Sequence, residues 1–192
     1  HYSVAISQRV DYLADRDEYR DALDQQLIDW VSHIGITPFP VPNTNASSTH
    51  QWLSLSQPSA IIISGGNNIG EYKHRDEQEK ALIDWAITHN HPLLGICRGM
   101  QFIAHYFDTP LKPVNNHVAT NHEITGTFKA TVNSYHQYAL IRFPLLFQFF
   151  PPCLYSPIYA ISLTSTPLPL PYTHPTPPPT HLLLNSPAPP PP

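Results

Sequence analysis

Short apolar runs alternate with longer polar stretches from residue 2 to residue 107. The runs are four to six residues long, which is the length of a strand; they are Tyr2–Ser7, Thr37–Val41, Ala60–Ile63 and Leu93–Ile96. The last two are apolar throughout, as strands buried in a parallel sheet are. Pro38 and Pro40 favour an edge position for the second run, because proline cannot donate a hydrogen bond to a neighbouring strand.

Between these runs, apolar side chains recur three and four residues apart, which predicts helices. The first helix would begin near Tyr19 and end at Gly35. Asp76 followed by Glu79 resembles a capping box and would open another helix with a solvated first turn. The remaining helices are expected around Thr49–Leu55 and over Arg98–Phe107. This alternation predicts an α/β fold of three layers, a mostly parallel sheet with helices on both faces.

The composition changes abruptly after Leu140. Residues 1–140 hold 23 of the 24 charged residues and all seven glycines, whereas residues 141–192 hold one charge and 16 of the 23 prolines. Short strands are expected before the change, with Phe128–Val132 the clearest, and polyproline II conformers after it. We therefore predict an α/β domain at 1–140 whose last strands are missing or replaced. Residues 141–192 would be an apolar, proline-rich tail that is disordered or frame-shifted.

The overall composition excludes several classes of function. A formal net charge of -4 offers no basic surface for nucleic acid or for an anionic membrane. No apolar run reaches the roughly 18 residues of a membrane helix. The two cysteines, Cys97 and Cys153, form no disulfide framework, so a reducing, cytoplasmic setting is expected. The histidines are scattered, and we expect neither a metal nor another cofactor.

The sequence Gly95-Ile-Cys97-Arg-Gly99 lies between the last apolar run and the helix that follows it. G-x-C-x-G at a strand-to-helix turn is the cysteine form of the nucleophile elbow. The residues beside the nucleophile must be small, because the sharp turn brings them against neighbouring strands. The pattern predicts Cys97 as a nucleophile whose thiolate is favoured by the helix N-terminus, with the amide of Arg98 as an oxyanion donor. The alternative is that Cys97 is a buried, inert thiol.

Three other positions are candidates for the same cleft. Gly66 follows a buried strand in a glycine pair, where a backbone amide can approach a ligand; the alternative is a plain tight turn. Gln101 lies one helical turn after Cys97 and therefore on the same face. His136 ends a polar strand and is either a cleft residue or a surface histidine.

Residues 1–140 resemble the class I glutamine amidotransferase-like superfamily, and within it the γ-glutamyl hydrolase branch. The resemblance rests on Ser64–Gly70, Leu94–Gln101 and Val132–His136. It implies a flavodoxin-like sheet and cleavage of a small γ-glutamyl amide through a cysteinyl thioester, with hydrolysis or transfer of ammonia to a synthetase partner. The implied roles are Cys97 as nucleophile, Gly66 and Arg98 as oxyanion pair, and Gly65, Gln101 and His136 as substrate-pocket residues.

One part of the family pattern is absent from this sequence. The family requires a histidine and an acid in a Trp-His-Pro-Glu type motif, whereas His174-Pro175 is followed by Thr176 and no Asp or Glu occurs after Glu123. A cysteine without its base is poorly activated, so impaired activity is predicted. A frame shift or gene truncation after Leu140 would explain the loss, and the other two reading frames of the DNA would test it.

Three classes of function follow from these observations. The first is a γ-glutamyl amide hydrolase or amidotransferase by descent. The second is a non-catalytic γ-glutamyl binding or regulatory module that keeps the pocket without the catalytic histidine and acid. The third is an interaction protein whose proline-rich segment at 167–192 recruits a partner; the lack of basic residues beside these prolines disfavours it.

Overall fold

The computed structural model describes residues 2–115, 118–124, 130–135, 137–140, 148–150 and 160–163, with the side chains of 2–115 and 137–140. The helices are α1 (Gln25–His33), α2 (Ala46–Ser56), α3 (Lys73–His89) and α4 (Arg98–Tyr106). The strands are β1 (Ser3–Ser7), β2 (Arg9–Leu13), β3 (Glu18–Ala22), β4 (Thr37–Val41), β5 (Ala60–Ile63), β6 (Leu93–Ile96), β7 (Leu111–Pro113), β8 (Val118–Ile124), β9 (Ala130–Tyr135), β10 (Tyr138–Leu140), β11 (Gln148–Phe150) and β12 (Ala160–Leu163).

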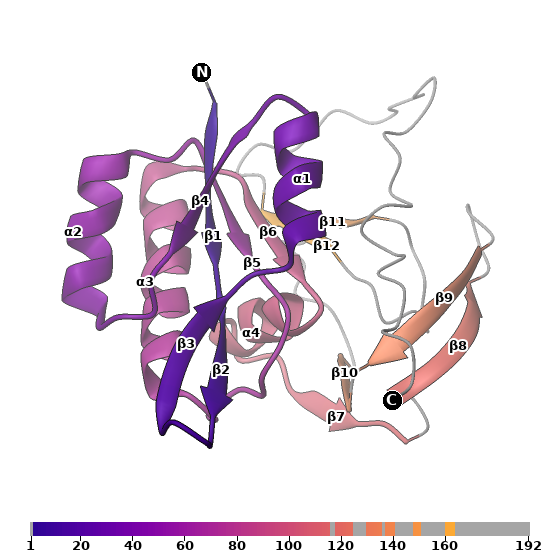
Figure 1. Ribbon diagram of the computed structural model, residues 1–192. Helices are drawn as coiled ribbons and strands as arrows, with labels where there is room; N and C mark the ends of the chain where they lie inside the picture. Colours follow the sequence, from indigo (N-terminus) through magenta and orange to yellow (C-terminus); the bar gives the residue numbers. More distant parts are fainter. Residues whose placement is uncertain are drawn as a thin grey trace, which may run out of the picture.

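Six strands of the described chain form the central sheet, in the order β11-β12-β6-β5-β1-β4 (Figure 1). β4, β1, β5 and β6 are parallel neighbours, which confirms the predicted parallel α/β arrangement for these four strands. β4 carries Pro38 and Pro40 and lies at the edge of the sheet, as expected. The carboxyl ends of the parallel strands share one edge, which is where open α/β sheets bind ligands.

Two short strands of the tail join this sheet. β12 pairs antiparallel with β6, and β11 pairs antiparallel with β12. The composition-based prediction did not include these strands. The rest of the segment at 141–192 lies outside the described residues, so the boundary after residue 140 and the replacement of the last native strands stay predictions.

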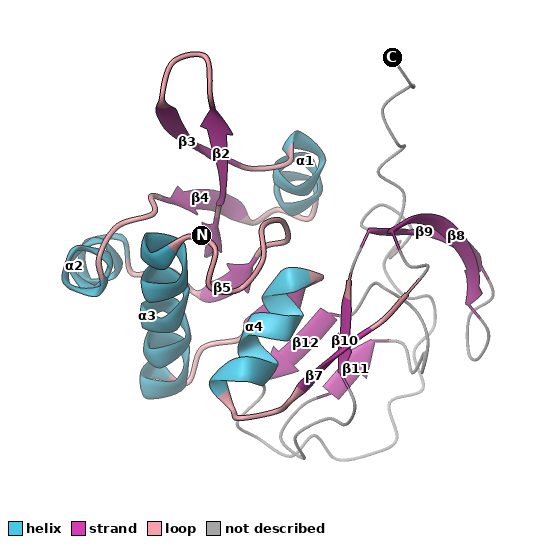
Figure 2. Ribbon diagram, turned by 90° about the horizontal axis from the view of Figure 1, so that it is seen from below, coloured by secondary structure: helices cyan, strands magenta, loops and turns pink. Residues whose placement is uncertain are grey.

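Helices cover both faces of the sheet, and each face has its own apolar cluster. Alternate residues of β1 point to opposite faces: Val4 and Ile6 pack with Leu27 and Val31 of α1, whereas Ala5 packs with the cluster under α2, α3 and α4. Figure 2 shows α1 on one side of the sheet and the other three helices on the opposite side. This arrangement confirms the predicted covering of both faces.

The first helix starts later than its apolar spacing predicts. Glu18–Ala22 is strand β3, which pairs antiparallel with β2. Tyr19 lies opposite Tyr12, with ring centroids 4.7 Å apart, and such cross-strand aromatic pairs stabilise hairpins. α1 begins only after Asp24, whose carboxylate accepts from the Gln26 amide at 2.9 Å.

The predicted capping box at Asp76 and Glu79 is wrong. α3 begins at Lys73, after Tyr72, which makes no side-chain capping bond. Asp76 instead accepts from the amide of Gly70 at 2.7 Å, and Glu79 is fully buried. The other two helices differ from their predicted bounds by a few residues at most.

Three small antiparallel pairs among the described strands lie outside the central sheet: β2 with β3, β7 with β10, and β8 with β9. β9 overlaps the predicted strand at Phe128–Val132, of which Phe128 and Lys129 lie outside the described residues. Among the described residues, no helix is long and apolar enough to cross a membrane.

Candidate active site

Cys97 occupies the turn between β6 and α4. β6 ends at Ile96 and α4 begins at Arg98, so one residue separates a buried strand from a helix. The cysteine has φ 53° and ψ -112°. Residues other than glycine rarely adopt a positive φ, and a backbone held in such a conformation costs about 1–3 kcal/mol. Its carbonyl oxygen accepts from the Gln101 amide at 3.2 Å. This strained turn is the geometry expected of a nucleophile elbow.

Two glycines let the elbow pack against its surroundings. A Cβ on Gly99 would lie 1.9 Å from the carbonyl oxygen of Ile63 in β5, and one on Gly95 would lie 2.7 Å from the amide nitrogen of Met100. No side chain fits at such distances, so the predicted need for small residues on either side of Cys97 is confirmed. α4 therefore lies directly on the end of β5, which continues into residues 64–66, the glycine loop.

The glycine loop lies against the elbow. A Cβ on Gly65 would be 3.5 Å from the Cβ of Cys97. Arg75 donates to all three carbonyl oxygens of the loop, from Nη2 to Ser64 (3.1 Å) and Gly65 (2.9 Å) and from Nη1 to Gly66. In a trans peptide the N–H points opposite to the preceding carbonyl, so the amides of Gly65 and Gly66 face away from Arg75. No described group accepts from these two amides, which fits oxyanion donors.

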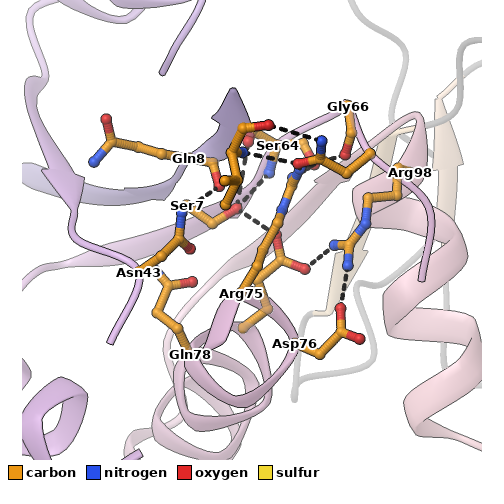
Figure 3. A network of polar contacts seen from close by, with 12 residues as sticks. Ser7, Gln8, Asn43, Ser64, Gly66, Arg75, Asp76, Gln78 and Arg98 are labelled. Carbon is orange, nitrogen blue, oxygen red and sulfur yellow. Dashed lines mark hydrogen bonds and ion pairs between the residues drawn. The ribbon is translucent and has the colours of Figure 1, made fainter. Parts of the chain in front are cut away.

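Arg75 belongs to a buried network of ion pairs beneath the glycine loop (Figure 3). Its Nε donates to Oε1 of Glu79 at 2.9 Å, and Oε2 of the same carboxylate accepts from Arg98. Arg98 also pairs with Asp76, and the Ser7 hydroxyl donates to Oε1 of Glu79 at 2.9 Å. The side chains of Arg75 and Glu79 are fully buried. Two guanidinium groups and two carboxylates balance in charge, as buried ions require.

Sequence reasoning missed this network. The expectation that Asp76 and Glu79 form a solvated helix start is wrong, because both carboxylates pair with Arg98. The signal that could have found it is the spacing along α3. The residues that share one stripe of this helix are Arg75, Glu79, Leu82 and Ala86. Charged residues such as Arg75 and Glu79 that continue the apolar stripe of a helix face the core, which predicts that they pair with other buried charged or polar groups.

The thiol of Cys97 is half-buried and free of disulfide bonds. Burial raises the pKa of this thiol above its ordinary value. The hydrogen bond from the Arg98 amide and the positive charges of Arg75 and Arg98 lower the same pKa by less. The net direction is upward, opposite to the favoured thiolate that the sequence predicts, because the cost of desolvating the charge exceeds these stabilising contacts. No histidine within the described ranges hydrogen-bonds Cys97.

The raised pKa predicts a pH dependence. Iodoacetamide alkylates the thiolate only, so the alkylation rate of Cys97 should still be rising with pH where an ordinary thiol has levelled off. The rate is measured by mass spectrometry on the peptide that contains Cys97, over pH 6 to pH 10.5. The same peptide in urea-unfolded protein serves as the control with an ordinary pKa. A folded-state midpoint below that of the unfolded chain would contradict the prediction.

Two of the three substrate-pocket candidates, Gly65 and Gln101, lie within the described residues. Gly65 adjoins Cys97, as described above. Gln101 is buried in α4, and its Nε2 donates to the carbonyl oxygen of Tyr138 in β10 at 2.9 Å. That bond ties the elbow helix to the strand that follows His136. His136 itself lies outside the described residues.

A cavity of about 240 Å³ opens beside the glycine loop. Its walls come from the glycine loop, Ile96, the end of β3, the start of α1 and Arg9. The side chain of Arg9 lies over Gly66, since a Cβ there would be 3.1 Å from the Cβ of Arg9. The cavity therefore borders the candidate oxyanion donors on the side of α1. No cluster of metal-ligating residues occurs in the part of the chain that the structure describes.

Comparisons with known proteins identify relatives of this chain. The profile of Glutamine amidotransferase class-I matches residues 17–155. The Gamma-glutamyl-CDP-amidate hydrolase of Campylobacter jejuni subsp. jejuni serotype O:2 is 32% identical over 149 residues, which cover 71% of each protein. The glutamine amidotransferase-like protein YvdE of Lactococcus lactis subsp. lactis is 29% identical over 97 residues, 43% of this chain and 40% of YvdE.

A solved structure shares the fold. It is the crystal structure of a GMP synthase subunit from Thermoplasma acidophilum, with a TM-score of 0.54 and 23% sequence identity. The match covers 77% of this chain and 70% of that chain. Together, the family profile and the Campylobacter relative show that this chain belongs to the class I glutamine amidotransferase family.

Proposed function

We propose that this chain cleaves a small γ-glutamyl amide through a thioester on Cys97, as in the γ-glutamyl hydrolase branch of the family. One observation carries the proposal: a cysteine in a strained strand-to-helix turn, at the start of α4, with the glycine loop against its Cβ. The name of the Campylobacter relative, a hydrolase of a γ-glutamyl amide, supports the same class of substrate.

In the proposed reaction the Cys97 thiolate attacks the γ-carbonyl carbon, and the carbonyl oxygen becomes an oxyanion. The amides of Gly66 and Arg98 hold that oxyanion. The C–N bond then breaks, the amine leaves with a proton, and the γ-glutamyl thioester remains. Water hydrolyses the thioester to glutamate and restores the thiol. Ammonia released from glutamine would go to solution or to a synthetase partner.

Gly65, Gln101 and His136 are the proposed residues of the glutamyl pocket. The side-chain amide of Gln101 is held by its hydrogen bond to Tyr138 in β10. Gln101 lies on the same face of α4 as Cys97 and would contact the substrate there. A reducing, cytoplasmic setting suits a free thiol at this position.

A second candidate function is a non-catalytic γ-glutamyl binding or regulatory module. Residues 124–192 contain no Asp or Glu, so this stretch supplies no acid to orient a catalytic histidine. The raised pKa of Cys97 makes such a base more important, since the resting thiol is mainly protonated at neutral pH. This candidate keeps the elbow and the glycine loop and lacks efficient turnover.

One experiment separates the two candidates. The full chain is treated with a chloroketone analogue of glutamine, and the adduct is mapped by mass spectrometry, while glutamate release from glutamine is followed in parallel. An adduct on Cys97 together with turnover supports the hydrolase. An adduct without turnover supports the binding module. A folded protein that forms no adduct contradicts both.

The cavity beside the glycine loop is the proposed place for the amine part of the substrate. Arg9 brings a positive charge to its wall; Nε pairs with Asp11 at 2.7 Å, and no described group accepts from the Nη nitrogens. Asp24, also in the wall, is a capping residue whose carboxylate accepts from the Gln26 amide. An anionic amine part, such as the CDP-amidate in the name of the Campylobacter relative, would suit Arg9.

Replacing Arg9 with methionine should therefore weaken binding of anionic γ-glutamyl conjugates by about tenfold, which corresponds to one charge-assisted hydrogen bond. Binding is measured as protection of Cys97 against the chloroketone, with one carboxylate-bearing and one phosphate-bearing conjugate. Glutamine, which lacks an anionic amine part, should protect both proteins equally. Arg20→Met on the same hairpin is the matched control, because Arg20 pairs with Glu18 and does not line the cavity. Equal weakening for glutamine would contradict the assignment.

A further inference from the structure

Glu79 connects the two sides of the candidate oxyanion hole. We propose that Glu79 and Arg75 are positioning residues that hold the glycine-loop amides and the Arg98 amide at a set separation around the γ-carbonyl oxygen. This inference rests on the proposed function and adds the residues that shape its site. Neither side chain is placed against the substrate, so each acts through the backbone that it holds.

The first half of the hole is held through carbonyl oxygens. Arg75 binds the carbonyls of the glycine loop on one side, which directs the loop amides to the other. Its Nη1 also donates to Oδ1 of Asn67 at 2.7 Å. Ser7 adds a second link, because its Oγ accepts from the Ser64 amide at 2.9 Å and donates to Glu79 at 2.9 Å. The loop is therefore fixed from beneath by a buried guanidinium and a hydroxyl.

The second half of the oxyanion hole is the backbone amide of Arg98, and it is held in place through the side chain of the same residue. Arg98 follows Cys97 directly as the first residue of α4, and the guanidinium of the same residue binds Glu79 and Asp76. The guanidinium carbon also lies 4.9 Å from the ring centroid of Phe102, one turn along α4. Movement of this side chain would move the first residue of α4 and its amide.

One carboxylate therefore joins both halves, with Oε1 on Arg75 and Oε2 on Arg98. A bridge of this kind matters because oxyanion donors act only when they meet the developing charge at hydrogen-bond distance. Shifts of about 0.5 Å in such groups already reduce activity. All the side-chain groups that form the bridge are buried, so water does not replace a lost bond there.

Two reagents separate the oxyanion hole from the thiol itself. A glutamine chloroketone is attacked at its carbonyl carbon by the thiolate, giving a hemithioketal oxyanion; sulfur then displaces chloride to leave a thioether. Iodoacetamide is attacked directly at carbon with loss of iodide, and no oxyanion forms. The ratio of the two rates at Cys97 therefore reports on the oxyanion hole, whereas a change in thiol pKa alters both rates together.

Glu79→Gln keeps the shape of the side chain and presents a single acceptor oxygen, so one of the two guanidinium bonds is lost. We expect the rate ratio to fall by about tenfold or more, a fraction of the effect of removing one oxyanion donor. Ser7→Ala is the milder second variant and should lower the ratio about threefold, since it loosens one half only. Lys80→Gln is the matched control, because it breaks the exposed 2.8 Å ion pair with Asp84 on the same helix. Its ratio should equal that of the wild type.

Each outcome decides the inference. A lower ratio of chloroketone to iodoacetamide rates in Glu79→Gln supports the inference, provided that circular dichroism shows the variant to be folded. If Glu79→Gln does not fold, the smaller fall of this ratio in Ser7→Ala supports it instead. If Glu79→Gln is folded and its rate ratio is unchanged, the inference is overturned, even where both rates change together or the stability falls. The proposed function is left intact by that result. If iodoacetamide modifies wild-type Cys97 while the chloroketone does not, the proposed function is wrong, and this inference is overturned with it.

Discussion

Replacing Gly99 with alanine is expected to destabilise the domain by about 3 kcal/mol or more, a large share of the 5–15 kcal/mol that holds a typical domain folded. The added Cβ would lie 1.9 Å from the carbonyl oxygen of Ile63. That oxygen belongs to β5, so no flexible side chain can move away, and α4 must shift relative to the sheet. The shift would also displace Cys97. Urea unfolding of the two proteins measures the difference.

The sign of this effect distinguishes packing from helix propensity. In an uncrowded helix, glycine to alanine stabilises by up to about 1 kcal/mol. Gly35→Ala, just after the end of α1, is the control for crowding alone: its added Cβ meets nothing within 4 Å, and only its φ of 80° is unfavourable for alanine. A Gly99→Ala protein as stable as the wild type would mean that α4 does not lie on the end of β5.

Replacing Cys97 with serine is expected to abolish adduct formation with the chloroketone and to lower any γ-glutamyl turnover by about 10⁴-fold or more, the usual effect of losing a catalytic nucleophile. The serine hydroxyl has almost the size of the thiol and the same strained backbone, so the fold should persist. Its proton is far less acidic, and no base in the described part of the chain contacts position 97. Adduct mass and glutamate release measure the two effects.

Cys153 provides the matched control for this prediction. Cys153→Ser removes the other cysteine of the chain and should leave the adduct and the turnover unchanged. Cys97→Ala should unfold at nearly the same urea concentration as Cys97→Ser, which shows that the loss is chemical. An adduct of equal yield in Cys97→Ser, on another residue, would show that Cys97 is not the nucleophile.

The sequence was informative wherever a local rule applied. Ala60–Ile63 and Leu93–Ile96 form strands with the predicted bounds, because four apolar residues between polar turns leave few alternatives. The apolar spacing from Tyr19 to Ile34 was misleading, since a hairpin strand and a helix lie end to end within it. The Asp24 cap and the Tyr12–Tyr19 pair decide where one element ends and the other begins.

The sequence by itself determined the family, the strand-to-helix elbow and the cysteine in its turn, because G-x-C-x-G needs only neighbouring residues to reverse the chain. Only the tertiary structure decided the electrostatics of the site. Burial raises the pKa of Cys97, whereas the amide of Arg98 at the helix terminus lowers it, and the size of each effect depends on how the side chains pack around the thiol. The buried bridge through Glu79 joins segments from β1, β5, α3 and α4, and spacing along one helix cannot show which distant carbonyls and guanidinium groups its charges meet.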